Sequence, residues 1–354
     1  MTEAENIIGP MAERIFADLA DPRNIAAGKD ERWKADLWNV LEENGFPLSW
    51  VPDALGGAGL SLAEGFEILE AAGRAALAVP LAETMLAGWL LSQGAIPSPP
   101  GMMTIAPVRP DDYVTIDTDG ILRGRASKVP FARDVDYIAL LATDPTGTFI
   151  IQVRTADCQI IAGKNVAGEG RDLVIFDGVR PQAMAAAPEG FNQRTLILTG
   201  CVVRSVQTAG ALQAALKCTI QYAGERVAFG KPIGKFQAVQ INVARLAGEV
   251  AAATAASASA ADTFANLNSL DDGAFLEATS AKIRSAEAAG TASAIAHQVH
   301  GAIGLTIEYV LHRFTLRALS WSDDFGAEAY WAVQLGKRIA ELGADALWPL
   351  VASR

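Results

Sequence analysis

Cysteine, histidine and clustered basic residues are scarce in this chain of 354 residues, and each scarcity excludes a class of protein. The three cysteines, Cys158, Cys201 and Cys218, are odd in number and unevenly spaced, so they form no disulfide framework and suggest a reducing compartment. The three histidines have no thiol or carboxylate beside them at metal-ligand spacing, so we expect no metal site. A net charge of −11 without a Lys/Arg-rich patch argues against nucleic acid as a partner.

Long apolar runs are also missing. No stretch reaches the roughly 18 consecutive apolar residues of a membrane helix, and the N-terminal region has no basic segment followed by an apolar one. We therefore expect a protein of the cytoplasm with no membrane as a partner. Its 51% hydrophobic and 19% charged residues are enough for a sizeable core and argue against disorder.

The first part of the chain, residues 1–102, is predicted to be a helical domain. Apolar residues at helical spacing mark a helix over 35–44, and a second helix over 81–92 begins after a proline, which suits a first helical turn. Ser61 followed by Glu64 has the pattern of a capping box and predicts that a helix begins there and continues through Ala75.

The pattern changes over residues 103–192, which we predict to be a small β domain. Four short β-branched or aromatic runs, at 113–116, 137–141, 148–153 and 173–176, are separated by Gly, Pro and Asp turn residues. Runs of this length and spacing are typical of a small antiparallel sheet or barrel.

Long helices return over residues 193–354. Four Ala- and Leu-rich segments, at 194–225, 235–265, 272–300 and about 327–350, contain few helix breakers, and one carries a continuous apolar stripe. Short connections between them predict an antiparallel four-helix bundle. The fold class is therefore α+β, mainly α, with a helical domain, a β domain and a helical bundle in that order.

Two motifs in the bundle carry a resemblance to a known family. At a helix–turn–helix junction, residues 225–240 read ERVAFGKPIGKFQAVQ, and about seventy residues later 298–309 read QVHGAIGLTIEY. Together with the order of the three domains, these stretches resemble the signatures of the acyl-CoA dehydrogenases. That resemblance implies FAD as cofactor, an acyl-CoA as substrate and an electron-transfer flavoprotein as electron acceptor.

In the family, positions of these two motifs hold the adenosine and pyrophosphate half of the FAD of an adjacent subunit. Residue chemistry agrees, because the guanidinium fork of Arg226 matches a diphosphate and the flat ring of Phe229 suits an adenine. Each residue taken singly also has an ordinary explanation, such as a helix C-terminal charge, a core ring or a turn glycine. The resemblance assigns cofactor binding to Arg226, Phe229, Gln237, Gln298, His300 and Gly301.

The sequence departs from the family at the catalytic base. The family uses a glutamate that removes the α-proton of the thioester while a hydride leaves the β-carbon for the flavin. Aligning forward from the second motif brings Phe325 to one known position of this base, and aligning back from the first motif brings Gly200 to the other. Neither residue can remove a proton, so the sequence assigns no catalytic residue at either place.

Asp323 and Asp324 lie beside the first of these positions, and two interpretations stay open. Asp324 is a weak candidate for a shifted base with a shorter side chain. Alternatively, the segment 322–324 caps the helix predicted to begin near Ala327, because acids are favourable at a helix N-terminus.

A second departure concerns the flavin ring. The loop of the β domain that embraces the ring in the family is shortened here, and the family's Trp-x-Thr strand motif is replaced by residues 128–130. Lys128 removes the aromatic wall, and Pro130 has no backbone N–H to donate to the flavin.

Both departures affect the half of the site that a subunit builds for its own flavin, whereas the half given to a neighbour persists. We expect a subunit that shares FAD with a homologous partner, resembling the non-catalytic subunit of the heterotetrameric (α₂β₂) dehydrogenases of steroid CoA thioesters. The alternatives are a self-sufficient homo-oligomer that uses Asp324 as base and a flavin-free assembly scaffold.

Overall fold

The computed structural model describes residues 7–22, 25, 32–267 and 270–352. The N-terminal helices lie where the sequence predicted them, and the capping box is present, since the backbone N–H of Ser61 donates to Glu64 at 2.8 Å and that of Glu64 donates to the Ser61 hydroxyl at 3.3 Å. The helical elements of this part are α1 (Ile8–Leu19), α3 (Trp33–Glu43), α4 (Leu62–Arg74) and α5 (Leu81–Gln93), with short 3₁₀ turns η1 (Phe46–Leu48) and η2 (Asp53–Leu55).

The β region forms one eight-stranded sheet. Its order is β6-β7-β3-β2-β4-β5-β8, with β1 paired to β4. Two predictions need correction: the sheet does not close into a barrel, and it is mixed, because β1 and β2 both run parallel to β4. The strands are β1 (Met103–Ala106), β2 (Tyr113–Ile116), β3 (Leu122–Pro130), β4 (Tyr137–Asp144), β5 (Gly147–Arg154), β6 (Gln159–Ile161), β7 (Arg171–Val179) and β8 (Ala183–Ala186).

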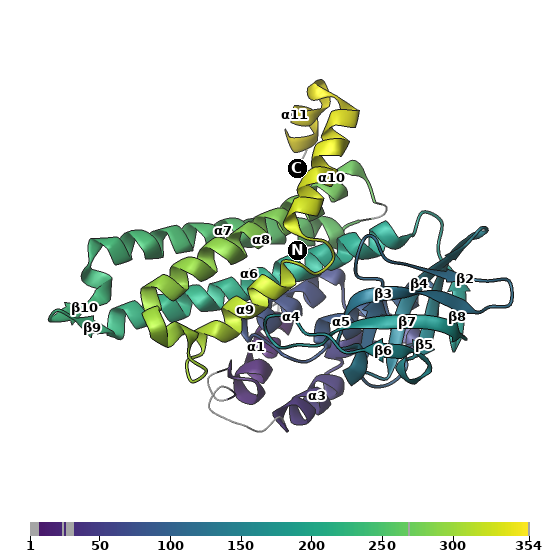
Figure 1. Ribbon diagram of the computed structural model, residues 1–354, viewed down its shortest axis with the longest axis horizontal. Helices are drawn as coiled ribbons and strands as arrows, with labels where there is room; N and C mark the ends of the chain where they lie inside the picture. The colour runs from purple at the N-terminus through teal and green to yellow at the C-terminus, as the bar shows by residue number, and fades with distance from the viewer. Residues whose placement is uncertain (1–6, 23–24, 26–31, 268–269, 353–354) are drawn as a thin grey trace.

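The C-terminal helices form a bundle beside the sheet (Figure 1), and three of the four predicted helices belong to it. These are α6 (Gln193–Glu225), α7 (Gln237–Ala265) and α8 (Asp272–His300). The fourth is α9 (Leu311–Trp321), and not the predicted 327–350 helix. That segment is interrupted at Gly343, whose φ of +87° ends a helix, and divides into α10 (Glu328–Leu342) and α11 (Ala344–Ala352).

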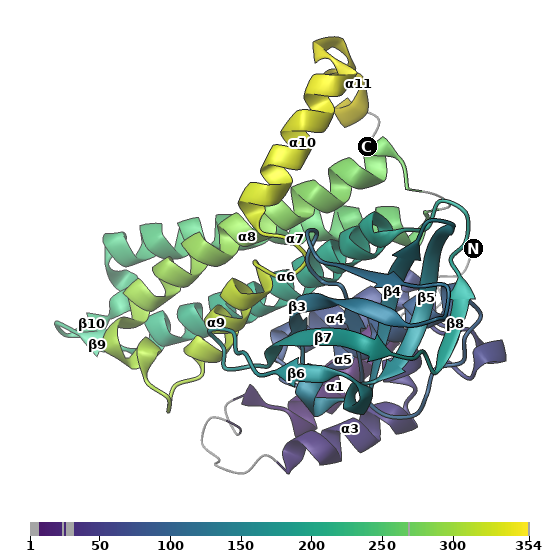
Figure 2. The same ribbon diagram turned by 45° about the vertical axis from the view of Figure 1, so that its right-hand side comes forward.

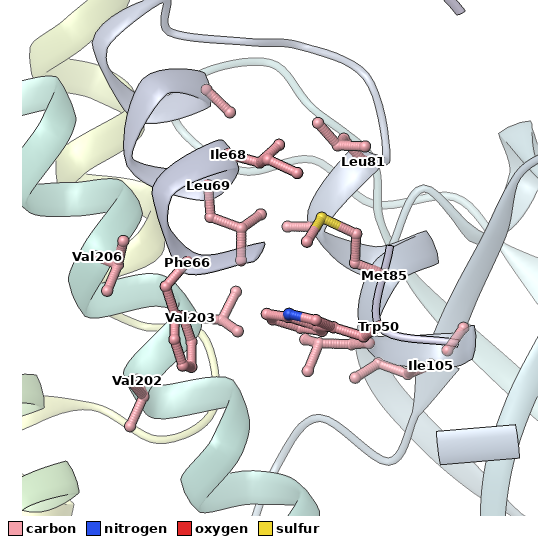
Figure 3. Close-up of a cluster of buried hydrophobic side chains, with 14 of the residues drawn as sticks. Trp50, Phe66, Ile68, Leu69, Leu81, Met85, Ile105, Val202, Val203 and Val206 are labelled. Carbon is pink, nitrogen blue, oxygen red and sulfur yellow. The ribbon is translucent and has the colours of Figure 1, made fainter. Parts of the chain in front are cut away.

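The N-terminal helices pack against the bundle through α6. Trp50 and Phe66 meet edge to face at 5.3 Å, and Figure 3 shows them with side chains of α4 and α5 facing Val202, Val203 and Val206 of α6. The most apolar part of α6 is long enough to cross a membrane, but 94% of it is buried inside the fold, as in a core helix. The segment of α6 that carries Gly200 is therefore embedded in the largest core of the protein. The domain boundaries near 102 and 192 stay predictions.

Candidate functional site

The two positions that the family uses for a catalytic base lie against each other. Phe325, in the loop between α9 and α10, is 1% exposed, and its ring covers Gly200 on α6 so closely that a Cβ at Gly200 would overlap the ring. A glycine permits this approach because it has no side chain. Each position is therefore blocked by the residue at the other, and the space where a base would face a substrate is filled by a phenyl ring.

The Phe325 ring is held there by its backbone. Phe325 has φ +58°, a left-handed conformation that is unfavourable for a bulky residue. Its carbonyl oxygen accepts a hydrogen bond from the indole N–H of Trp331 at 2.9 Å and another from the Cys201 thiol at 3.4 Å. These donors come from α10 and α6, so both helices hold the strained turn in place.

Asp324, the adjacent residue, lies in a buried ionic network. Arg171 of β7 donates two hydrogen bonds to its two carboxylate oxygens, Nε to Oδ1 at 3.1 Å and Nη2 to Oδ2 at 3.0 Å. Arg204 of α6 donates a third from Nε to Oδ2 at 3.0 Å and also pairs with Glu83 of α5. The remaining members are Glu169, paired with Arg171 at 3.5 Å, and Arg317, paired with Glu169 at 2.8 Å. We call this set the Asp324 cluster: Glu83, Glu169, Arg171, Arg204, Arg317 and Asp324.

The Asp324 cluster contains three carboxylates and three guanidinium groups, so their formal charges cancel. Burial raises the pKa of Asp324, but the charges of Arg171 and Arg204 outweigh burial and leave the pKa below its ordinary value. Burial raises the pKa of Glu169 as well, and Arg317 and Arg171 reverse that shift in the same way. Both carboxylates are thus held ionised, with their oxygens directed at guanidinium groups.

The contacts of Asp324 argue against both interpretations that the sequence left open. The cap interpretation is wrong, because α10 has Ala327 at its N-cap without any side-chain cap, and Asp324 bonds to arginines instead. A general base needs a free oxygen facing its substrate, whereas both oxygens of Asp324 are occupied. Asp323 is exposed beside it and belongs to no ion pair of the described residues. The arrangement favours a structural role for Asp324.

The segment that replaces the family's Trp-x-Thr motif lies on β3, inside the sheet. Lys128 lies exposed at φ +56°, and the carbonyl of Pro130 is engaged by the Thr104 hydroxyl at 2.7 Å. The next residue, Phe131, is 9% exposed and lies 5.7 Å from the Arg171 guanidinium. We call Gly200, Phe325 and the Asp324 cluster the inner end of the site. Its side chains are buried and pack against one another.

The opposite end of the bundle is open. After α6, the chain forms a hairpin of β9 (Val227–Ala228) and β10 (Lys231–Pro232) that projects at the far end in both views (Figures 1 and 2). Phe229 and Gly230 make its two-residue turn, with φ of +51° and +81°. Such turns favour Asn-Gly, yet here the first position is a phenylalanine whose ring is 96% exposed. A strained, exposed aromatic residue indicates a contact outside this chain.

Four other predicted residues share this exposed end. Arg226 ends α6 with its side chain exposed, and Gln237 is the first residue of α7, also exposed. Gln298 is exposed near the end of α8. Gly301 follows α8 at φ +67°, with nothing within 4 Å of where a Cβ would be, so its backbone is accessible.

His300 differs from the other predicted residues because it is buried. Its ring stacks on Tyr222 with centroids 4.4 Å apart, and its Nδ1 lies 2.8 Å from the carbonyl oxygen of Ala296. Burial lowers the pKa of His300, which favours a neutral ring. The Tyr222 hydroxyl also donates to the His300 carbonyl at 3.3 Å. Through this contact, the helix ending in Arg226 meets the turn that carries Gly301, so the two motifs lie together.

The residues therefore fit only part of an FAD molecule. The outer end comprises Arg226, Phe229, Gln237, Gln298 and the Gly301 turn. It offers amides, an accessible backbone, an exposed ring and a guanidinium that forms no ion pair with the part of the chain that the structure describes. These groups suit a diphosphate and an adenine. Nearby apolar side chains are exposed as well and extend this surface: Val227 57%, Ile303 42%, Leu305 73% and Ile307 74%. At the inner end, the Phe325 ring lies against Gly200 and fills both positions that the family uses for a base.

Comparisons with known proteins agree with the motifs. Residues 195–339 match the family model described as acyl-CoA dehydrogenase, C-terminal domain. Acyl-CoA dehydrogenase IpdE2 of Mycobacterium tuberculosis is 28% identical over 319 residues, which cover 89% of this chain and 91% of that protein.

Solved structures share the fold over nearly the whole chain. The crystal structure of the ChsE4-ChsE5 complex from Mycobacterium tuberculosis matches with a TM-score of 0.85 and 23% identity, over 97% of this chain and 99% of that one. A variant of the Tcur3481-Tcur3483 steroid acyl-CoA dehydrogenase matches with a TM-score of 0.81 and 24% identity, over 94% and 97% of the two chains. Both structures combine differently named chains.

Proposed function

Because this chain belongs to the acyl-CoA dehydrogenase family, we propose that it is the non-catalytic subunit of a heteromeric enzyme that desaturates an acyl-CoA at its α and β carbons. In this proposal a homologous partner holds the flavin ring, the catalytic base and the thioester. The present chain completes the adenosine and pyrophosphate end of the partner's FAD and works in the cytoplasm.

One observation supports the proposal. The outer end has exposed side chains and a strained turn, whereas buried side chains fill the inner end. The Phe325 ring and Gly200 block both base positions, and the two oxygens of Asp324 are taken by arginines. Phe229, by contrast, is kept at φ +51° with its ring almost fully exposed. A chain with this division can help to bind a cofactor held by a neighbour, while the described residues at the two base positions cannot remove a proton.

The bound FAD would supply the acceptor for the hydride that leaves the β-carbon. The residues of this chain would act on the other end of that cofactor: Arg226 as a donor to the diphosphate, Phe229 as a stacking surface for the adenine, and Gln237, Gln298 and the Gly301 backbone as donors. The buried ring of His300 would act indirectly, by fixing the turn at Gly301. We propose that electrons then pass to an electron-transfer flavoprotein, as the family resemblance implies.

The substrate class follows from the relatives. One of the matching structures is named a steroid enzyme, so we propose a CoA thioester of a bulky steroid-derived acid, bound by the partner. Co-expression with candidate partner chains tests the proposal. The chain purified alone should be colourless and inactive, and the complex should show the visible absorbance of oxidised flavin together with dehydrogenase activity. Full flavin occupancy and turnover in the lone chain would instead support a self-sufficient enzyme.

A further inference from the structure

The three cysteines of the chain differ in what surrounds their thiols. Cys201 is fully buried on α6 against the Phe325 carbonyl, and burial raises its pKa to about 12. Cys158, half-buried just before β6, contacts the carbonyl oxygen of Arg154 at 3.6 Å, and burial raises its pKa to about 12 as well. Both thiols therefore stay protonated and react slowly at neutral pH. Cys218 is also half-buried, but it faces groups that accept and donate protons.

A buried histidine faces the Cys218 thiol. The sulfur, on α6, lies 4.0 Å from Nε2 of His300 at the end of α8. His300 is 4% exposed, and its Nε2 has no other polar partner among the described residues. Because its Nδ1 points at the carbonyl oxygen of Ala296, which can only accept, the ring proton lies on Nδ1. The neutral ring thus presents the lone pair of Nε2 to the thiol.

A tyrosine hydroxyl approaches the same sulfur. The hydroxyl oxygen of Tyr309, in the turn before α9, lies 3.5 Å from the Cys218 sulfur. Burial, followed by the Cys218 thiol, raises the pKa of Tyr309, so the phenol keeps its proton. Since Nε2 of His300 can only accept, the thiol donates to it, and the sulfur accepts from the tyrosine. One proton path therefore runs from the hydroxyl through the sulfur to the imidazole.

Aromatic contacts fix the relative positions of these groups. The His300 ring stacks on Tyr222 at 4.4 Å and lies 5.1 Å from the Tyr309 ring, and the two tyrosines meet edge to face at 5.9 Å. We call Cys218, Tyr222, His300 and Tyr309 the Cys218 cluster. It joins α6, α8 and the turn before α9, and Gly301 follows directly after His300. A change at the sulfur can therefore reach the Gly301 turn of the outer end.

A base beside a thiol and a donor beside its sulfur are the two features that activate a cysteine. Transfer of the thiol proton to Nε2 of His300 gives a thiolate beside an imidazolium, and the Tyr309 hydroxyl then donates to the charged sulfur. Thiolates of this kind are the ones that hydroperoxides oxidise. Cys201 is roughly 25 Å away along α6 at 1.5 Å per residue, and Cys158 lies beside the sheet, so a thiol that resolves the oxidised form must come from outside.

We propose that Cys218 is a site of reversible oxidation by hydroperoxides. With hydrogen peroxide, the thiolate attacks one oxygen, the O–O bond breaks, and the leaving hydroxide takes the imidazolium proton and becomes water. The sulfur is oxidised to a sulfenic acid as the peroxide is reduced. A small thiol such as glutathione then attacks the sulfenic sulfur and releases water, which leaves a mixed disulfide. A second molecule of the small thiol restores Cys218 and departs as a disulfide.

Oxidation should also weaken flavin binding in the complex, and this consequence alone rests on the proposed function. A mixed disulfide at Cys218 removes the S–H that donates to His300. It also adds atoms between α6 and the rings of His300 and Tyr309. The turn at Gly301 then shifts, and its backbone no longer meets the cofactor in the same position.

Trapping of the sulfenic acid tests the site in the full chain alone. The protein is treated with hydrogen peroxide and dimedone at neutral pH, and each cysteine adduct is quantified by mass spectrometry. Cys218 should react at least about tenfold faster than Cys158, the matched control whose half-buried thiol faces a carbonyl oxygen, since tenfold corresponds to one unit of thiol pKa. Equal rates at the two cysteines would overturn the proposal.

Two variants separate activation from structure. His300→Phe keeps a ring against Tyr222 without a base, so Cys218 labelling should slow at least about tenfold, and alkylation by iodoacetamide should reach half its maximal rate at a higher pH. Tyr309→Phe removes only the hydroxyl and should shift the same pH profile in the same direction by a smaller amount. A wild-type pH profile in the folded variants would contradict activation by these groups.

The flavin content of the complex tests the consequence. Complexes with the partner are assembled from chain carrying a glutathione disulfide at Cys218 and from Cys218→Ser chain treated in the same way. The modified complex should hold about threefold to tenfold less FAD, the affinity that one hydrogen bond carries. Undiminished FAD would overturn the link to the flavin. Absence of FAD from the untreated complex would instead contradict the proposed function and leave the thiol chemistry standing.

Discussion

The two ends of the bundle helix α6 have opposite character. Around Gly200 and Arg204, the Phe325 ring packs against Gly200, and the Asp324 cluster pairs buried carboxylates with buried guanidinium groups. Around Arg226 and Phe229, the arginine is exposed and forms no ion pair with the described residues, and the phenyl ring is exposed apart from an edge contact with Phe236 at 6.2 Å. One helix thus carries a closed structural core at one end and an incomplete binding surface at the other.

The difference between the two ends of α6 indicates where this chain needs a partner. A buried network with balanced charges has no remaining capacity for a substrate, and replacing one member leaves the others unpaired. The Phe229 ring in its strained turn has an edge contact with Phe236 at 6.2 Å and is otherwise exposed, so we expect its main benefit in a complex. The following predictions test that division, from the largest expected effect to the smallest.

Asp324→Asn should give the largest loss of stability. The substitution leaves Arg171 and Arg204 buried with unbalanced charge, which costs about 3–5 kcal/mol when one partner of a buried pair is removed. Urea unfolding measures this loss. The matched control is Asp323→Asn, an exposed change expected to stay within about 0.5 kcal/mol. A stable Asp324→Asn protein that has lost a measurable dehydrogenase activity would point to a base instead.

Gly200 and Phe325 should be energetically coupled. Gly200→Ala should cost about 1–3 kcal/mol because its methyl group overlaps the Phe325 ring, and Phe325→Ala should cost about 3–5 kcal/mol by leaving a cavity. In the Phe325→Ala background the added methyl group has room, so Gly200→Ala should cost at least about 1 kcal/mol less. A double-mutant cycle by urea unfolding measures this difference. Strictly additive losses would contradict the contact.

Acidification should lower the free energy of unfolding through the carboxylates of the Asp324 cluster. Because the folded protein holds the pKa of Asp324 below its ordinary value of 3.8, its contribution to stability is complete above that value and is lost as the pH falls through the lower, folded value. The wild-type free energy of unfolding should therefore decrease on acidification below about pH 4 (the ordinary range for aspartate). The decrease should be shallower in Asp324→Asn, because the lowered pKa of Asp324 no longer contributes, whereas that of Glu169 in the same cluster remains. Parallel curves would exclude an ionised Asp324.

Phe229→Asn should change stability least and in the opposite direction. Asparagine tolerates the left-handed conformation at the first turn position, so the lone chain should gain about 0.4–1 kcal/mol. The same variant should lower the flavin content of the complex, because the exposed ring is gone. Val227→Asn, an exposed change in the adjacent strand, is the control for the loss of apolar surface. Unchanged stability together with unchanged flavin content would remove the functional reason for Phe229.

The sequence predicted the fold well where the signal is local. Helical spacing and the capping box at Ser61 located the first helices, and the two motifs indicated the exposed end. The bundle's fourth helix was missed because α9 is short and carries several basic residues, whereas 327–350 has a continuous apolar pattern broken only by Gly343.

Non-local contacts explain what sequence reasoning could not predict. Asp324 lies 153 residues from Arg171 and 120 residues from Arg204 along the chain, so its ion pairs depend on packing between the sheet and the bundle. One signal was available: a charged residue such as Arg204 within the apolar run 196–212 requires a buried partner. The burial of His300 against Tyr222 depends in the same way on how α6 and α8 pack.

The flavin content of the complex tests the central claim most directly. Arg226→Ala and its control Arg245→Ala, an exposed arginine on α7, should be co-expressed with the catalytic partner and compared by FAD absorbance per complex. The account predicts intact complexes in both cases, with FAD reduced at least about tenfold by Arg226→Ala, since a charged hydrogen bond to phosphate contributes about 1.5–3 kcal/mol. Undiminished FAD in the Arg226→Ala complex would contradict it.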